Sequence, residues 1–112
     1  MAKLTRHARY RMSERLGGRI EEKKRLFQEA LAKGINRDRW VELWAKNGHL
    51  FKRERHLSGK VYAFLGRRYN DSRRYIWKGV CFVCSIRTKR LFTCFKVDDE
   101  EMLDFIERVK GV

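Results

Sequence analysis

Residues 80–97 have the sequence VCFVCSIRTKRLFTCFKV, in which two apolar segments of strand length flank the charged residues 87–90. Both segments are rich in β-branched and aromatic residues, which predicts an antiparallel hairpin with its tip at 87–90. A symmetric hairpin pairs Ile86 with Leu91 and Cys84 with Thr93. One face then carries Phe82, Cys84, Ile86, Leu91, Thr93 and Phe95, and the other carries Cys81, Val83, Ser85, Phe92, Cys94 and Lys96. Because both faces are largely apolar, we expect this hairpin to lie centrally in a sheet, with helices covering one side.

A helix follows the hairpin directly. Residues 98–101 are four consecutive acids, which supply an N-cap acid with a glutamate three residues later. Apolar residues then recur at helical spacing, at Met102, Leu103, Ile106 and Val109. The pattern predicts an amphipathic C-terminal helix within 98–112.

Upstream of the hairpin, caps and apolar spacing predict three helices, at 5–16, 21–33 and about 37–46. Gly17-Gly18 and Gly34 provide stop signals, and Asn36 is a good cap for the third helix.

From residue 49 the pattern changes, because cations dominate 49–58 and only a few apolar anchors remain. We interpret 49–58 as a strand or arm that leads into a turn at Ser58-Gly59. Further strands are expected at 60–65 and 74–78, with a loop over 66–72.

These elements predict an α+β fold, with N-terminal helices packed on a curved, mainly antiparallel sheet of four or five strands and a C-terminal amphipathic helix. The length of 112 residues, without proline or an internal repeat, indicates a single domain over 1–112. Its expected parts are a helical part at 1–47, a sheet at 48–97 and the acidic helix at 98–112.

The charge of the chain is large and unevenly distributed. Lys and Arg total 28 against 14 Asp and Glu, a net charge of +14. Residues 98–112 carry six acids and two bases, a net −4, so residues 1–97 carry a net +18. The imbalance predicts a basic surface for a large polyanion, with the acidic element either placed off this surface or folded back across it.

Several classes are disfavoured. No apolar segment approaches the roughly 18 residues of a membrane span, and residues 1–7 lack the apolar part of a secretory signal, so we expect a cytoplasmic protein without membrane contact. Three cysteines do not make a disulfide framework. Cys81 and Cys84 match C-x-x-C, but on a strand they point to opposite faces, so we expect small buried residues and neither a metal nor a cofactor.

Basic and aromatic residues alternate over 53–78, where Tyr62, Tyr75 and Trp77 are interleaved with arginines. Guanidinium groups bind phosphates and aromatic rings stack on unpaired bases, so the stretch predicts nucleic-acid binding. The predicted binding residues are Arg53, Arg55, Lys60, Arg67, Arg68, Arg73, Arg74, Arg87, Lys89, Arg90 and Lys96.

The sequence also carries residues suited to RNA cleavage without a metal. There is no glycine-rich phosphate loop, and the basic region has too few carboxylates to hold Mg²⁺. In RNA the 2′-OH can attack the adjacent phosphate with help from an acid, a base and a cation. His7, Arg11 and Arg15 share one face of the first predicted helix and supply these groups. A cationic strand residue such as Arg87 or Lys96 would complete the set, and His49 and His56 are the other candidates.

The residues Leu4-Thr5-Arg6-His7-Ala8-Arg9-Tyr10-Arg11-Met12-Ser13-Glu14-Arg15-Leu16-Gly17 resemble a T-[KR]-H-A-x-x-R-[MI]-x-E-R-x-G opening of small phage and bacterial proteins. The segments 30–35 (ALAKGI) and 90–97 (RLFTCFKV) are more loosely similar to later parts of those proteins. They in turn resemble the barnase–colicin–RelE group of metal-independent ribonuclease toxins. The segment 40–57 and the acidic final helix fall outside this pattern.

The resemblance implies a site between the N-terminal helices and the concave face of the sheet, with His7, Arg11, Arg15 and Thr93 as its catalytic residues. Two main functions stay open, with a structural protein of a virion or ribosome as a third option. The first is a toxin-like endoribonuclease. The second is a non-enzymatic phage RNA- or DNA-binding protein that inhibits or captures a host nucleoprotein complex, such as an anti-defence or anti-CRISPR inhibitor. The expected partners are a nucleic acid, RNA rather than DNA, or a ribonucleoprotein, together with a cognate protein inhibitor or target.

Overall fold

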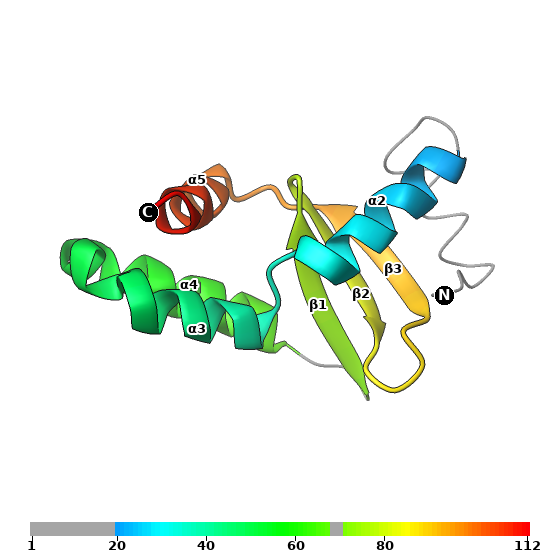
Figure 1. Ribbon diagram of the computed structural model, residues 1–112, viewed down its shortest axis with the longest axis horizontal. Helices are drawn as coiled ribbons and strands as arrows, with labels where there is room; N and C mark the ends of the chain where they lie inside the picture. The colour runs from blue at the N-terminus through cyan, green and yellow to red at the C-terminus, as the bar shows by residue number, and fades with distance from the viewer. Residues whose placement is uncertain (1–19, 68–70) are drawn as a thin grey trace.

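The computed structural model describes residues 20–67 and 71–112, which form an α+β fold (Figure 1). The elements are α2 (Ile20–Lys33), α3 (Arg37–Asn47), the 3-10 helix η1 (Gly48–Glu54), α4 (Arg55–Gly66), β1 (Ser72–Trp77), β2 (Val80–Ser85), β3 (Leu91–Lys96) and α5 (Glu100–Lys110). The helix predicted at 5–16 lies outside the described residues. None of the helices within the described ranges is long and apolar enough to cross a membrane.

The two helices predicted at 21–33 and 37–46 are confirmed as α2 and α3. Asn36 caps α3, and its side-chain oxygen accepts a hydrogen bond of 2.9 Å from the backbone N–H of Arg39. Phe27 and Ala30 are fully buried and form the apolar side of α2. Local capping and apolar spacing therefore determine this part of the chain.

The strand or arm predicted at 49–58 and the strand at 60–65 are wrong, because η1 and α4 occupy this region. Leu57, Val61 and Leu65 are all buried, and their spacing of four residues places them on one face of a helix. Gly59 does not form a turn. It lies within α4, at a position where a Cβ atom would meet no atom within 4 Å. The helical part therefore extends to residue 66, beyond the expected limit of 47.

The strands predicted at 74–78, 80–86 and 90–97 are confirmed in position as β1, β2 and β3. They form an antiparallel sheet in the order β1-β2-β3, so the described sheet has three strands and not four or five. Lys78 and Gly79 join β1 to β2 with φ values of 50° and 77°. Two consecutive positive φ angles are typical of a tight type I′ hairpin turn, where glycine is favoured.

The register of the β2–β3 hairpin differs from the symmetric prediction. Cys84 pairs with Leu91, Val83 pairs with Thr93, and the register shifts between these two pairs, which leaves Phe92 as an extra residue in β3. Leu91 and Cys94 consequently pack in one cluster with Phe82, whereas the predicted faces separated Cys94 from both. The expected central position holds for β2, but β3 is an edge of the described sheet.

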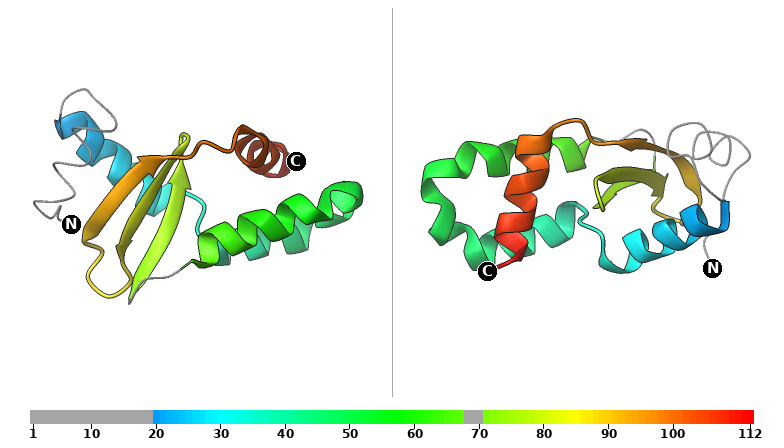
Figure 2. Two further views of the ribbon diagram at one scale, coloured as in Figure 1. Left: turned by 180° about the vertical axis from the view of Figure 1, so that it is seen from behind. Right: turned by 90° about the horizontal axis from the view of Figure 1, so that it is seen from above.

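Helices pack on both faces of the sheet, and the prediction of a single covered side is wrong. On one face, Phe27 and Ala30 of α2 pack with Phe82 and Leu91. On the other face, Cys81 belongs to a second core cluster that α3, α4 and α5 help to build. Figure 2 shows α2 beside the sheet and the other three helices gathered in a separate layer.

The C-terminal helix is confirmed as α5 and is part of the core. Asp99 is its N-cap and accepts a 3.0 Å hydrogen bond from the backbone N–H of Met102. The buried residues of α5 are Met102, Phe105, Ile106 and Val109. Phe105 was not among the predicted apolar residues, and it contacts the rings of Trp40, Trp44 and Phe51.

An ion pair fixes the outer side of α5 to η1. Arg108 donates two hydrogen bonds to the Glu54 carboxylate, at 2.8 and 2.5 Å. These hydrogen bonds lower the pKa of Glu54. Buried apolar residues and this bidentate pair together hold α5 in the helical layer.

Candidate nucleic-acid interface

The predicted site residues fall in several parts of the fold. Thr93 is the one predicted catalytic residue within the described ranges and lies on β3; His7, Arg11, Arg15 and the predicted binding residue Arg68 lie outside those ranges. The other binding residues lie in η1 (Arg53), on or next to α4 (Arg55, Lys60, Arg67), on β1 (Arg73, Arg74), in the β2–β3 connection (Arg87, Lys89, Arg90) and at the end of β3 (Lys96).

Four of these cations gather around a cleft between α4 and β3. The cleft has a volume of about 340 Å³, and its lining includes Lys60, Arg67 and Lys96. Phe64 and Phe95 also line the cleft and meet edge to face, with ring centroids 6.3 Å apart. The Arg74 guanidinium lies 4.8 Å from the Phe64 ring centroid and 5.5 Å from that of Phe95. Residues distant in sequence thus form one basic, aromatic site.

The cleft also contains carboxylates. Asp98 and Asp99 belong to its lining, and the Lys60 amine lies 2.5 Å from Asp99. The hydrogen bond from Lys60 lowers the pKa of Asp99, and the same bond raises the pKa of Lys60. Lys60 is therefore engaged by the N-cap of α5, whereas Arg67 and Lys96 form no ion pair with a described carboxylate.

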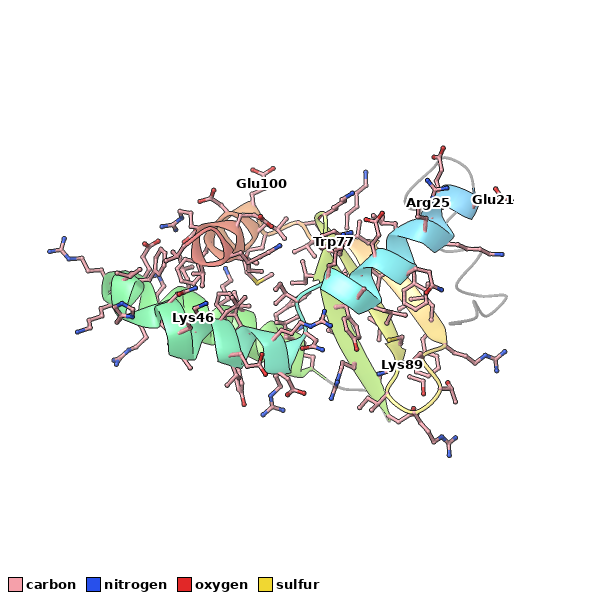
Figure 3. The ribbon with its side chains drawn as sticks, in the orientation of Figure 1. Glu21, Arg25, Lys46, Trp77, Lys89 and Glu100 are labelled. Carbon is pink, nitrogen blue, oxygen red and sulfur yellow. The ribbon has the colours of Figure 1, made fainter. Side chains whose placement is uncertain are left out.

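The second group of cations is the hairpin tip, which carries Arg87, Lys89 and Arg90. All three side chains are exposed, and none forms an ion pair within the described part of the chain. Figure 3 shows Lys89 in this connection, at the end of the sheet farthest from α5. The tip therefore presents three positive charges to solvent.

Hydrogen bonds to Asp71 and Ser85 order the tip. The Ser85 hydroxyl donates to the Asp71 carboxylate at 2.7 Å and accepts from the backbone N–H of Thr88 at 3.1 Å. The backbone N–H of Ile86 donates to the Asp71 carbonyl at 2.7 Å. Lys89 adopts a left-handed φ of 61°. These hydrogen bonds tie the connection that carries the tip cations to Asp71 and Ser85.

The remaining predicted residues do not join these two groups. Arg53 and Arg55 lie where η1 meets α4, at the outer end of the helical layer (Figure 1). The candidate bases His49 and His56 lie in the same region. On β1, Arg73 forms an ion pair of 3.4 Å with Asp38. The basic stretch 53–78, which is continuous in sequence, is therefore divided in space.

The interleaved aromatic residues of 53–78 also separate. Tyr75 is buried in the core, and the Trp77 indole N–H donates to Glu29 at 2.9 Å. Tyr62 is exposed but accepts a hydrogen bond from Arg37. The aromatic side chains beside the site cations are Phe64, Phe95 and the exposed Phe92, which sequence reasoning did not select. Had residues 57–65 been assigned to a helix from the spacing of their apolar residues, Phe64 would have been placed next to Lys60, one turn away on α4.

The cysteines are buried, as predicted. Cys81 and Cys84 belong to the core clusters on opposite faces of the sheet. Burial raises the pKa of Cys81 to about 12 and that of Cys84 to about 11. Within residues 20–67 and 71–112, no group of three His, Cys, Asp or Glu side chains is arranged to hold a metal ion.

The cations of the cleft and of the tip lie along β3, from Lys96 to residues 87–90. We call this region the β3 surface and define it by Arg67, Arg74, Arg87, Lys89, Arg90, Phe92, Thr93 and Lys96. No protein-family model, curated protein or solved structure matches this chain.

Proposed function

We propose that this protein binds nucleic acid, RNA rather than DNA, through the β3 surface. The observation that carries the proposal is the set of six cations on this surface that form no ion pair with any described carboxylate, namely Arg67, Arg74, Arg87, Lys89, Arg90 and Lys96. Arg73 and Arg108, in contrast, are neutralised by neighbouring acids. Unpaired cations retain their charge for a ligand.

The spacing of these cations favours a chain of phosphates over a single small anion. β3 has six residues, and a strand rises roughly 3.3 Å per residue, so the tip and the cleft lie on the order of 20 Å apart. One small anion cannot reach both ends, whereas a nucleic-acid backbone can. The net +18 over residues 1–97 supports the same partner through long-range attraction.

RNA cleavage without a metal is a second candidate function. It is favoured by the place of Thr93, which lies on β3 between the cleft residue Phe95 and the tip. A phosphate bound along the surface would pass this hydroxyl. In this function, His7 would transfer the proton of the 2′-OH, and Arg11 and Arg15 would stabilise the charged phosphorane, as the toxin resemblance implies. A binder that captures a host nucleoprotein would use the same cations and no proton transfer.

The binding proposal is tested by the anisotropy of a fluorescently labelled RNA at several salt concentrations. Loss of two phosphate contacts in the double variant Arg67→Gln/Lys96→Gln should lower the slope of log affinity against log salt by about 1.4 for a single strand. The control Lys46→Gln/Lys52→Gln removes two exposed charges from the helical layer, where Figure 3 shows Lys46. Equal slopes in both double variants would contradict the proposal.

Cleavage is tested separately by incubating labelled RNA with the wild-type chain in EDTA. The enzymatic candidate predicts products that persist in EDTA and disappear in His7→Ala, while the affinity for RNA changes little. RNA that stays intact at micromolar protein would refute cleavage and leave the binder.

A further inference from the structure

Phe92 is an exposed aromatic residue whose position follows from the register of β3. It keeps 37% of its surface exposed although it lies within a strand. Its neighbours in the strand are the buried Leu91 and the partly buried Thr93, and the exposed Arg90 precedes Leu91. The register shift places Leu91 and Cys94 in one fully buried cluster and leaves Phe92 as the extra, unpaired residue. In a regular strand Phe92 would lie on the same face as Cys94, two residues later, which is fully buried, so the extra residue accounts for the exposed fraction of Phe92.

The surroundings of Phe92 are cationic. Arg90 lies two residues before it, and Lys89 and Arg87 complete the ordered tip next to it. Strand edges that carry several cations resist pairing with a second copy of the same chain, because like charges would meet. An exposed ring next in sequence to exposed cations instead matches the chemistry of an unpaired base flanked by phosphates.

We infer that Phe92 stacks on an unpaired base while Arg87, Lys89 and Arg90 bind the adjacent phosphates, so that the β3 surface selects single-stranded over duplex nucleic acid. This inference rests on the proposed function and adds the class of ligand. In a duplex the phosphates are present, but each base is stacked between the adjacent bases of its strand. Phe92 therefore finds no exposed base on which to stack.

The hydrogen bonds of the tip support this assignment. Asp71 and Ser85 fix the connection that carries the three cations, so a single strand meets an ordered site and the cost of ordering falls mainly on the nucleic acid. The ring and the cations also belong to one continuous segment, 87–92, so their relative positions do not depend on distant elements.

The test measures the affinity of Phe92→Ala for a labelled single-stranded oligoribonucleotide and for a duplex of the same length. Stacking predicts a loss of roughly 5- to 150-fold for the single strand and a change of less than about twofold for the duplex. Phe92→Trp should keep or raise the single-strand affinity, and Phe92→Leu, which is apolar but lacks a flat ring, should behave like Phe92→Ala. Circular dichroism of each variant confirms the fold.

The outcomes separate the inference from the function on which it rests. If the wild-type chain binds neither RNA, the proposed function fails and the inference falls with it. If the wild type binds but Phe92→Ala loses affinity for single strand and duplex equally, or for neither, only the stacking role is refuted. Sedimentation velocity could instead detect self-association of the wild type that Phe92→Ala abolishes while the RNA affinity of the variant equals that of the wild type. That result would assign Phe92 to a protein contact and overturn the inference.

Discussion

Replacing Phe105 by alanine tests whether the acidic C-terminal helix is part of the core or a cover that can be removed from the basic surface. Phe105 is 0% exposed, and its ring centroid lies 5.9, 6.0 and 5.8 Å from those of Trp40, Trp44 and Phe51. The side chain thus fills the space where α5, α3 and η1 meet. A buried Phe→Ala substitution costs about 3–5 kcal/mol, through lost transfer energy and the cavity left behind.

For a chain of 112 residues, an unfolding entropy of about 2.1 cal/mol/K per residue converts this cost into a fall in Tm on the order of 13–21 °C. Urea titration and thermal unfolding followed by circular dichroism measure both quantities. Phe92→Ala is the matched control, since the same substitution at a phenylalanine that keeps 37% of its surface exposed should lower the free energy of unfolding clearly less than Phe105→Ala does. A loss below about 1 kcal/mol in Phe105→Ala would show that α5 leaves the helical layer freely, and the core assignment would be wrong.

Three further predictions concern other parts of the structure. Hydrogen bonds from Lys60 and Arg108 lower the pKa values of Asp99 and Glu54. The stability that these two carboxylates contribute is therefore complete above the ordinary carboxyl pKa near 4 and is lost as the pH falls through their lower folded pKa values. Tm should drop below about pH 4, and Asp99→Asn should reduce this drop. Cys81 and Cys84 should not react with a thiol reagent at pH 8 until the protein unfolds, because both thiols are buried and burial raises their pKa values to about 12 and about 11. Rapid labelling of the native protein would contradict their burial. Ser85→Ala should destabilise the fold by about 1–3 kcal/mol and weaken RNA binding, because it removes the hydroxyl that bonds Asp71 and the backbone of Thr88. An RNA affinity equal to that of the wild type would show that these hydrogen bonds are not needed for binding.

The sequence predicted those elements whose signals are local. Four acids followed by an amphipathic pattern identified α5, and Asn36 identified the start of α3. The segment 48–66 was misassigned because Ser58-Gly59 resembles a turn and 61–64 is rich in β-branched and aromatic residues. The spacing of Leu57, Val61 and Leu65 fits a helix that the core then stabilises. Tertiary packing decided between two patterns that were both present in the sequence.

The site was predicted by residue type but not by arrangement. The sequence identified the arginines and lysines of the surface. It did not show that Lys60 and Lys96 line the same cleft, because a local pattern carries no information on residues so far apart in the chain. The exposed position of Phe92 depends on a one-residue register shift, which strict alternation cannot reveal. Sequence reasoning therefore identified the chemistry, and the register and the packing of α4 determined where it lies.

The most direct test of the account is the salt dependence of wild-type binding to a single-stranded RNA. If each of the six β3-surface cations that form no ion pair with a described carboxylate meets one phosphate, log affinity should fall against log salt with a slope of roughly −4, at about 0.7 per phosphate. The triple variant Arg87→Gln/Lys89→Gln/Arg90→Gln should reduce the magnitude of this slope by about 2. A slope near zero, or no binding at low salt, would contradict the central claim that this protein binds nucleic acid through the β3 surface.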